Sequence, residues 1–296
     1  MRKTTIAVLI FIVFAAGCTR RIDRNNPFDP GATTTTNGND NGSGEIVLTS
    51  PLFGYINWNG PYQKVRLSAA NSPYIVTGET YIGGNSLVIE GGVTIKYSGS
   101  YGITFLNPTI VASGTSANPI KFTSGRTTPA VGDYKAIVFG YLKSYDPSKP
   151  CSVNLNYITF EYGSGPNIYG ENSNVTNCTF SANEANDPRL YLNGEVKYSN
   201  FQNVDIESGV NISYCNISGS IAASSTAGQY KVNYCNLTKG STTVLTNNPN
   251  WAIDATNNWW GTTNAPTIAG YINGTFAGNV TYSPFASSSV SSAGPQ

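Results

Sequence analysis

Side chains that could support acid–base chemistry are few in this sequence, which contains no histidine. The densest group mixes both signs of charge and consists of Asp187, Arg189, Lys197, Asp205 and Glu207. A polysaccharide lyase needs a basic group and a cation that neutralises a carboxylate, whereas a glycoside hydrolase needs two facing carboxylates. No carboxylate recurs at one position of the repeat described below. We therefore interpret the group as a solvated surface and keep its members as weak catalytic candidates.

Cysteine is the second residue type with chemical potential, and four cysteines follow Cys18, at positions 151, 178, 215 and 235. Their spacing matches no zinc motif, so we expect no metal site and no cofactor; calcium enters only if the chain is a lyase. We expect Cys178, Cys215 and Cys235 to be small buried core residues. A Cys215–Cys235 disulfide could form in an oxidising compartment, and the sequence leaves the redox state of all four cysteines open.

Aromatic residues supply the candidate ligand-binding groups. Tyr198, Tyr214 and Tyr234 recur at one position of successive repeat units. Stacked aromatic rings with polar tips suit either a sugar-binding surface or a structural ladder, and the sequence leaves both open. Trp58 lies among Asn and Tyr residues and could be another exposed binding group or a cap at one end of the fold.

A six-residue phrase with an aliphatic first position repeats about every 20 residues in the second half of the chain. It starts at Leu155, Val175, Val196, Ile212, Val232 and Ile253. Its third column is Tyr157, Asn177, Tyr198, Tyr214, Tyr234 and Ala255, and its fourth is Ile158, Cys178, Ser199, Cys215, Cys235 and Thr256. Positions one and four cannot share a face of a straight strand, so we predict a bend at position three, with Asn177 in a left-handed conformation. The pattern indicates an all-β solenoid.

Phrases in both halves resemble bacterial surface proteins of the right-handed parallel β-helix type, which share the pectate-lyase-like solenoid fold. These are Ile89–Tyr97, Ala117–Ser124 and Asn257–Gly261. The resemblance implies a single-stranded β-helix of about 12 coils over residues 45–285. Enzymes with this fold are mainly polysaccharide lyases and hydrolases, but the paired-Asp and Gly-His-Gly phrases of polygalacturonases and the Trp-Ile-Asp-His phrase of pectate lyases are missing here.

The N-terminal segment predicts export and a lipid anchor. Residues 1–17 combine a basic start, a short apolar stretch and small residues before Cys18, which resembles a bacterial lipobox. The resemblance implies lipid attachment at Cys18 and placement at the outer membrane or cell surface. We expect residues 18–44 to form a flexible tether, residues 45–285 the β-helix and residues 286–296 a disordered Ser-rich tail.

Composition limits the partners. Charged residues make up 11% of the chain and the formal net charge is +1, which gives no electrostatic footprint for nucleic acid. We expect a monomer that meets the membrane through its lipid. The predicted function is non-catalytic: binding of extracellular polysaccharide or cell-envelope components, or service as a structural, adhesive rod. The alternative is a polysaccharide lyase or glycoside hydrolase that acts on an extracellular glycan.

Overall fold

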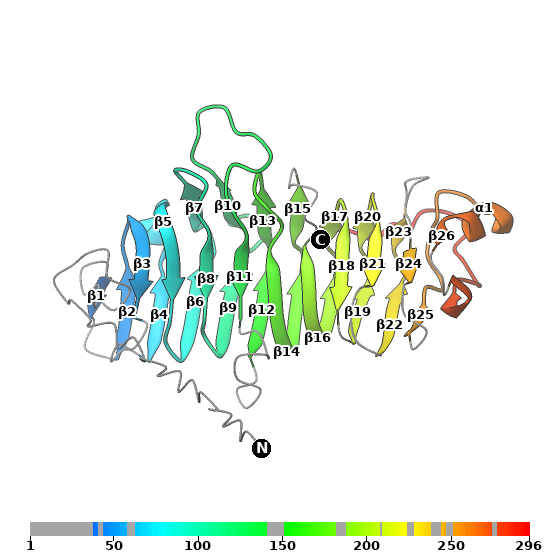
Figure 1. Cartoon of the computed structure of the whole chain (residues 1–296), viewed down its shortest axis with the longest axis horizontal. Coiled ribbons are helices and arrows are strands. Elements are labelled where there is room, and N and C mark those ends of the chain that lie inside the picture. Colours follow the sequence, from blue (N-terminus) through cyan, green and yellow to red (C-terminus); the bar gives the residue numbers. More distant parts are fainter. Residues whose placement is uncertain are drawn as a thin grey trace, which may run out of the picture.

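The computed structural model describes residues 38–40, 44–57, 63–140, 151–181, 188–207, 209–223, 228–237, 244–246, 251–273 and 277–296. Together they form an elongated rod of strands lying side by side, with β1 (Gly38–Asp40) at one end and α1 (Ala265–Gly270) at the other (Figure 1). The described strands pair in parallel, apart from the antiparallel pair of β1 with β2 (Glu45–Leu48). The chain is a parallel β-helix, as the sequence predicts.

Each coil places strand segments on three faces, which we name A, B and C. Face A contains β2, β4 (Lys64–Leu67), β6 (Ser86–Glu90), β9 (Thr109–Ser113), β12 (Ser152–Asn156), the ends of β14 (Asn167–Thr176) and β16 (Arg189–Lys197), β19 (Val210–Ser213), β22 (Gly228–Asn233), β25 (Trp251–Asp254) and β27 (Val280–Thr281).

Face B contains the starts of β3 (Leu52–Ile56) and β5 (Tyr74–Ile82), β7 (Thr94–Tyr97), β10 (Ile120–Ser124), β13 (Ile158–Glu161), β15 (Thr179–Ser181), β17 (Asn200–Phe201), β20 (Asn216–Ile217) and β23 (Asn236–Leu237). Face C contains the ends of β3 and β5, β8 (Ile103–Phe105), β11 (Ile137–Phe139), the starts of β14 and β16, β18 (Val204–Glu207), β21 (Ile221–Ala223), β24 (Val244–Thr246) and β26 (Ile272–Asn273).

From β12 onward, the turn from face A to face B is made by one residue in the left-handed region, an uncommon conformation for a residue with a Cβ. Its φ lies between 50° and 61° in Tyr157, Asn177, Tyr198, Tyr214, Tyr234 and Asn257. The predicted bend at the third position is therefore confirmed, including the conformation of Asn177. The first-position column also pairs in register from Leu155 through Val232.

The last repeat phrase lies in a different register from the one that the sequence predicts. Ile253 pairs with Tyr230 rather than Val232, so the bend in this coil falls on Asn257 and not on Ala255. The alignment was two residues out, and a slip of two keeps every side chain on the same side of a strand. Apolar alternation therefore could not reveal the error.

Apolar side chains fill the space between the three faces. On face B, Phe122, Phe160, Phe180 and Phe201 stack on successive coils with ring centroids 4.6–5.2 Å apart. Such rings bury a large apolar area and prefer offset, near-parallel contact. This inward column makes the strands of face B a firm support for the polar side chains that alternate with it.

A second inward column explains why cysteine and serine follow the bend. After the left-handed residue the next backbone N–H points into the rod, where it needs an acceptor. The side chain at the same position of the following coil provides one: Cys178 N donates to Ser199 Oγ at 3.1 Å, and Cys235 N donates to Asn258 Oδ1 at 2.8 Å. Between them, Cys215 N donates to Cys235 Sγ at 3.4 Å. The column is thus a set of small buried acceptors.

Short elements lie outside the three faces. These are the 3₁₀ turns η1 (Ala69–Asn71) and η2 (Ala277–Asn279), together with α1, whose side chain Ile268 is buried. No helix within the described ranges has the length and apolar character needed to cross a membrane.

The Ser-rich segment 286–296, expected to be disordered, instead follows the rod. Ala286 N donates to Asn258 O, Val290 N donates to Asn236 Oδ1 at 2.8 Å, and Gln296 N donates to Asn177 Oδ1 at 3.1 Å. The segment therefore runs back across several coils along the A–B corner. Because these backbone groups find partners on outward side chains, the segment does not need an apolar core of its own.

Candidate functional site

The structure separates the charged catalytic candidates. Arg189 and Asp205 are register partners on face C, with Arg189 Nε 3.8 Å from Asp205 Oδ2. Lys197 lies at the other end of β16, on face A, where its Nζ is 2.6 Å from Glu195 Oε2. Asp187 lies outside the described residues, and of Glu207 the structure describes the backbone alone, at the end of β18. Among the side chains of this group that the structure describes, Arg189 and Asp205 are brought together.

The cysteines behind Cys18 are buried thiols. Burial raises the pKa of the Cys178 thiol to about 12 and holds that of Cys215 well above its usual range, so both stay protonated and unreactive at neutral pH. Within the described ranges no three His, Cys, Asp or Glu side chains gather as metal ligands would. Cys18, the predicted lipid attachment site, and Trp58, a predicted ligand-binding residue, both lie outside the described residues.

The tyrosine column forms at the A–B corner, partly exposed to solvent. The rings of Tyr198 and Tyr214 stack at 5.4 Å and 21°, and those of Tyr214 and Tyr234 at 5.3 Å and 10°. No sugar ring fits between rings this close, so their facing surfaces serve the ladder. Ligand binding by these three residues stays a prediction, limited to ring edges, hydroxyls and the outer faces of the stack.

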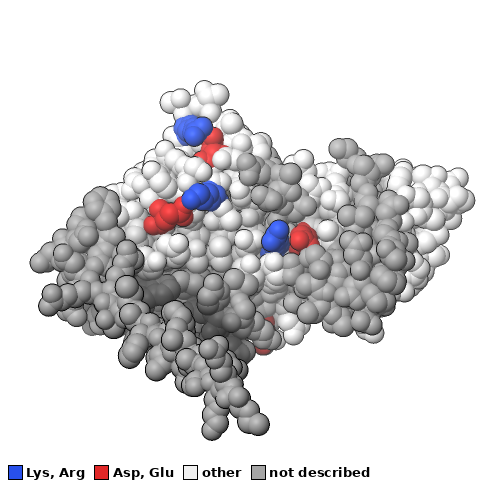
Figure 2. Space-filling model, viewed as in Figure 1, with Lys and Arg blue, Asp and Glu red and all other residues white. Residues whose placement is uncertain are grey.

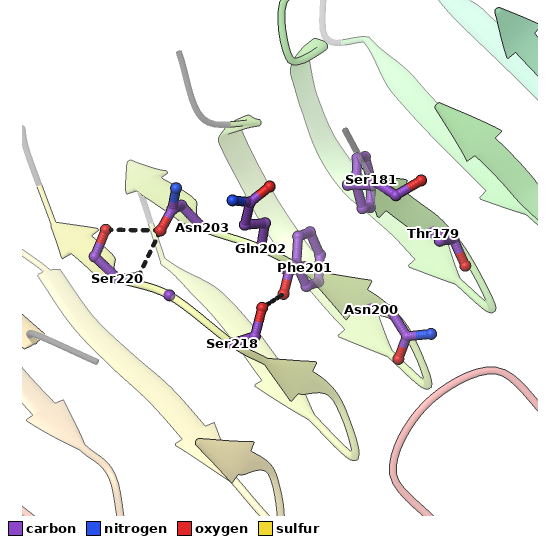
Figure 3. A pocket seen from close by; sticks show the side chains of 10 residues that line it. Thr179, Ser181, Asn200, Phe201, Gln202, Asn203, Ser218 and Ser220 are labelled. Atoms are coloured by element: carbon purple, nitrogen blue, oxygen red, sulfur yellow. Dashed lines mark hydrogen bonds between the residues drawn. The ribbon is translucent and has the colours of Figure 1, made fainter. Parts of the chain in front are cut away.

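A groove of about 650 Å³ lies beside this corner, on face B and its border with face C (Figure 3). It extends over three successive coils, formed by β15, β17 and the segment after β20. Its lining residues are Thr179, Phe180, Ser181, Asn200, Phe201, Gln202, Asn203, Ser218, Gly219 and Ser220. The two phenylalanines belong to the buried stack, and the other side chains are hydroxyls and amides.

Two of the amides are held in place by the neighbouring coil. Asn203 Oδ1 accepts from Ser220 N at 2.8 Å and from Ser220 Oγ at 3.2 Å, as Figure 3 shows. Asn200 Oδ1 accepts from Asn216 Nδ2 at 2.9 Å. In both cases the amide NH₂ makes no hydrogen bond within the described residues. The side-chain amide of Gln202 also makes none there. The groove thus presents oriented donors that can bind a polar ligand.

Gly219 fixes the shape of the groove at its C-face side. A Cβ on this residue would lie 1.9 Å from Asn203 Oδ1 and 2.3 Å from Gln202 O. Only glycine allows the backbone to approach the Asn203 side chain this closely. The turn after β20 therefore holds the orientation of Asn203.

The C-terminal segment borders the groove on its other side. Asn236 exchanges two hydrogen bonds with the backbone of Val290, and Asn216 Nδ2 donates to Ala293 O at 3.3 Å. A Cβ on Gly294 would lie 3.1 Å from Asn200 Oδ1, so the segment passes directly against a lining residue. Figure 3 shows the red ribbon of this segment near Asn200.

The groove was not among the predicted sites, although one signal for it is present in the sequence. Its outward side chains follow the fifth position of the repeat, which reads Thr179, Asn200, Asn216 and Asn236 on successive coils. Asn236 Nδ2 donates to Asn216 Oδ1 at 2.8 Å, which continues the amide ladder. A recurring Asn at an outward position predicts such a ladder. Gln202 and Asn203 carry no comparable signal, because they follow the repeat phrase.

Charge is sparse over the described surface, and most of it lies in ion pairs. In the view of Figure 2, charged side chains form a few separate spots in which cations lie beside anions. The ion pairs on the described residues join Glu45 to Lys64 and Arg66, Arg66 to Glu90, Lys121 to Glu161, Arg126 to Asp133, Lys135 to Glu79, Arg189 to Asp205 and Lys197 to Glu195.

Comparison of the chain with protein-family models, with curated proteins and with solved structures finds no match. The site must therefore be interpreted from its own geometry.

Proposed function

We propose that this chain is a non-catalytic, lipid-anchored surface protein that binds extracellular polysaccharide through the groove on face B. The observation that carries the proposal is the set of oriented, uncommitted amide donors of Asn200 and Asn203 over a rigid floor. Sugar-binding sites use such planar amides and hydroxyls to meet ligand hydroxyl groups. The groove also crosses successive coils, so a polymer lying along the rod would meet similar groups on each coil.

The anchor is the second part of the proposal, and it rests on the small residues that precede Cys18. A Cys18→Ser variant should move from the membrane fraction to the soluble fraction of fractionated cells. Cys178→Ser is the matched control, because Ser199 occupies the same inward column on the next coil. Its thiol is buried, so the control should stay with the membranes. Membrane retention of Cys18→Ser would contradict the anchor.

The glycan proposal is tested with the full-length protein, purified in a non-glycosidic detergent. Cosedimentation with insoluble polysaccharides measures binding, and reducing ends and unsaturated products are measured in the same samples. We expect retention without product. Product formation would overturn the non-catalytic proposal and direct attention to Arg189 and Asp205, which the structure brings together. Absence of retention on every polysaccharide would overturn glycan binding and leave a structural rod.

A further inference from the structure

The chemistry of the groove lining narrows the class of glycan, on the premise that the proposed function holds. None of the ten lining residues has an ionisable side chain. A uronic acid polymer would place a carboxylate in this groove on every sugar unit. Each carboxylate would lose part of its hydration without gaining a countercharge, which is unfavourable.

The cations near the groove in sequence are already engaged with carboxylates. Arg189 Nε lies 3.8 Å from Asp205 Oδ2 on face C, and Lys197 Nζ lies 2.6 Å from Glu195 Oε2 on face A. Both cations therefore already have a carboxylate as countercharge, which does not favour an anionic ligand.

The uncharged groups that remain match hydroxyl groups. Gln202 is exposed and offers an amide oxygen and an NH₂ group, while Asn203 offers the NH₂ group that Ser220 leaves unused. A sugar hydroxyl both donates and accepts, and so can satisfy either group. We infer that the groove binds a neutral polysaccharide, one whose repeating units carry hydroxyl groups and no carboxylate or sulfate.

The inference is tested by cosedimentation of the full-length protein with two panels. The neutral panel contains cellulose, xylan and mannan, and the acidic panel contains cross-linked polygalacturonate and alginate. Gln202→Ala and Asn203→Ala probe the groove. Gln229→Ala and Asn211→Ala are matched controls, because these residues are exposed on face A and leave the groove intact. Circular dichroism and thermal melting verify that all four variants fold.

We expect retention on at least one neutral polysaccharide and on neither acidic one. Each groove substitution should weaken neutral binding by about five- to tenfold, the usual cost of one lost hydrogen bond of this kind, while the controls change it by less than about twofold. Gln202→Lys places a cation in the groove and should create measurable binding to polygalacturonate that disappears at high salt.

The other outcomes are distinguishable. Retention on the acidic panel alone, weakened by the groove substitutions, would overturn the neutral class and keep glycan binding. Neutral binding that the groove variants and their controls affect equally would overturn the groove as the site. Retention on neither panel would overturn the proposed function itself.

Discussion

The N-terminal and C-terminal coils stack the same backbone but connect neighbouring coils with different outward side chains. In the N-terminal coils Arg66 lies between two carboxylates, with Nε 2.9 Å from Glu45 Oε1 and Nη1 3.2 Å from Glu90 Oε1. In the C-terminal coils Asn200, Asn216 and Asn236 form a ladder of amides. The first of these connections is ionic and the second is made of neutral hydrogen bonds.

This difference explains why the repeat is visible in only one half of the sequence. Like charges on neighbouring strands repel each other, so an ionic column must alternate in sign from coil to coil. An amide donates and accepts at once, so identical Asn residues can stack. The C-terminal coils therefore repeat the same letter at this position, whereas Arg66 reaches Glu45 and Glu90 diagonally, because its register partners are Val47 and Val88.

The largest effect is expected in the inward column of acceptors that follows the bend, at Asn258. Asn258→Leu removes the acceptor for Cys235 N and the donor to Val232 O and Ala255 O. Buried polar groups left without partners should lower the free energy of unfolding by about 3 kcal/mol, measured by urea denaturation. Asn211→Leu, on the exposed surface, is the control. A loss below about 1 kcal/mol would show that the inward column contributes little.

Converting one amide of the ladder into a charge tests the comparison directly. Asn216→Asp removes the donation to Asn200 Oδ1 and to Ala293 O, and it directs a carboxylate at two acceptors. We expect a loss of about 1–2 kcal/mol at pH 7 relative to wild type. The deficit should shrink at pH 3, where the protonated carboxyl can donate. Equal deficits at both pH values, or an equal loss in Asn211→Asp, would contradict this account.

The ion pairs of Arg66 should contribute less and should respond to salt. Arg66→Gln breaks the contacts to both carboxylates, of which Glu45 is the more buried, with 7% of its side chain exposed. Since Arg66 is itself one-third exposed, we expect a loss of about 1 kcal/mol at low ionic strength that falls toward zero in 1 M NaCl. Lys96→Gln, on the exposed side of β7, is the control. A salt-independent loss would point to packing of the arginine stem instead.

The smallest effect is expected in the acid range. The hydrogen bond from the Ser124 hydroxyl to Asp133, assisted by Ala130 N and Arg126, holds the pKa of Asp133 below its ordinary value of 3.8. A lowered folded-state pKa stabilises the fold above pH 3.8, and that stabilisation is lost as the pH falls through the folded-state value. Asp133→Asn should therefore flatten the stability profile below pH 4, measured by thermal melting. An unchanged profile would contradict this linkage.

Much of the fold could be predicted because its rules are local. The left-handed bend follows from the side-chain period of two, which separates Val175 from Cys178, and the stacking of like residues marks each coil. The error at Ile253 shows the limit of this reasoning, since a shift of two residues preserves the same period. The candidate groove could not be predicted in the same way, because Asn203 acquires its orientation from Ser220 on the next coil.

The sequence by itself determined the β-helix and, from Tyr157 through Tyr234, its bends and inward columns, because each depends on the residue type at one repeated position. Tertiary structure decided which charges meet, where the groove lies and what the C-terminal segment contacts. Tyr157 Oη, for example, donates to Gln296 O, 139 residues away along the chain. Such contacts depend on the lengths of all the intervening turns together, which no local sequence pattern specifies.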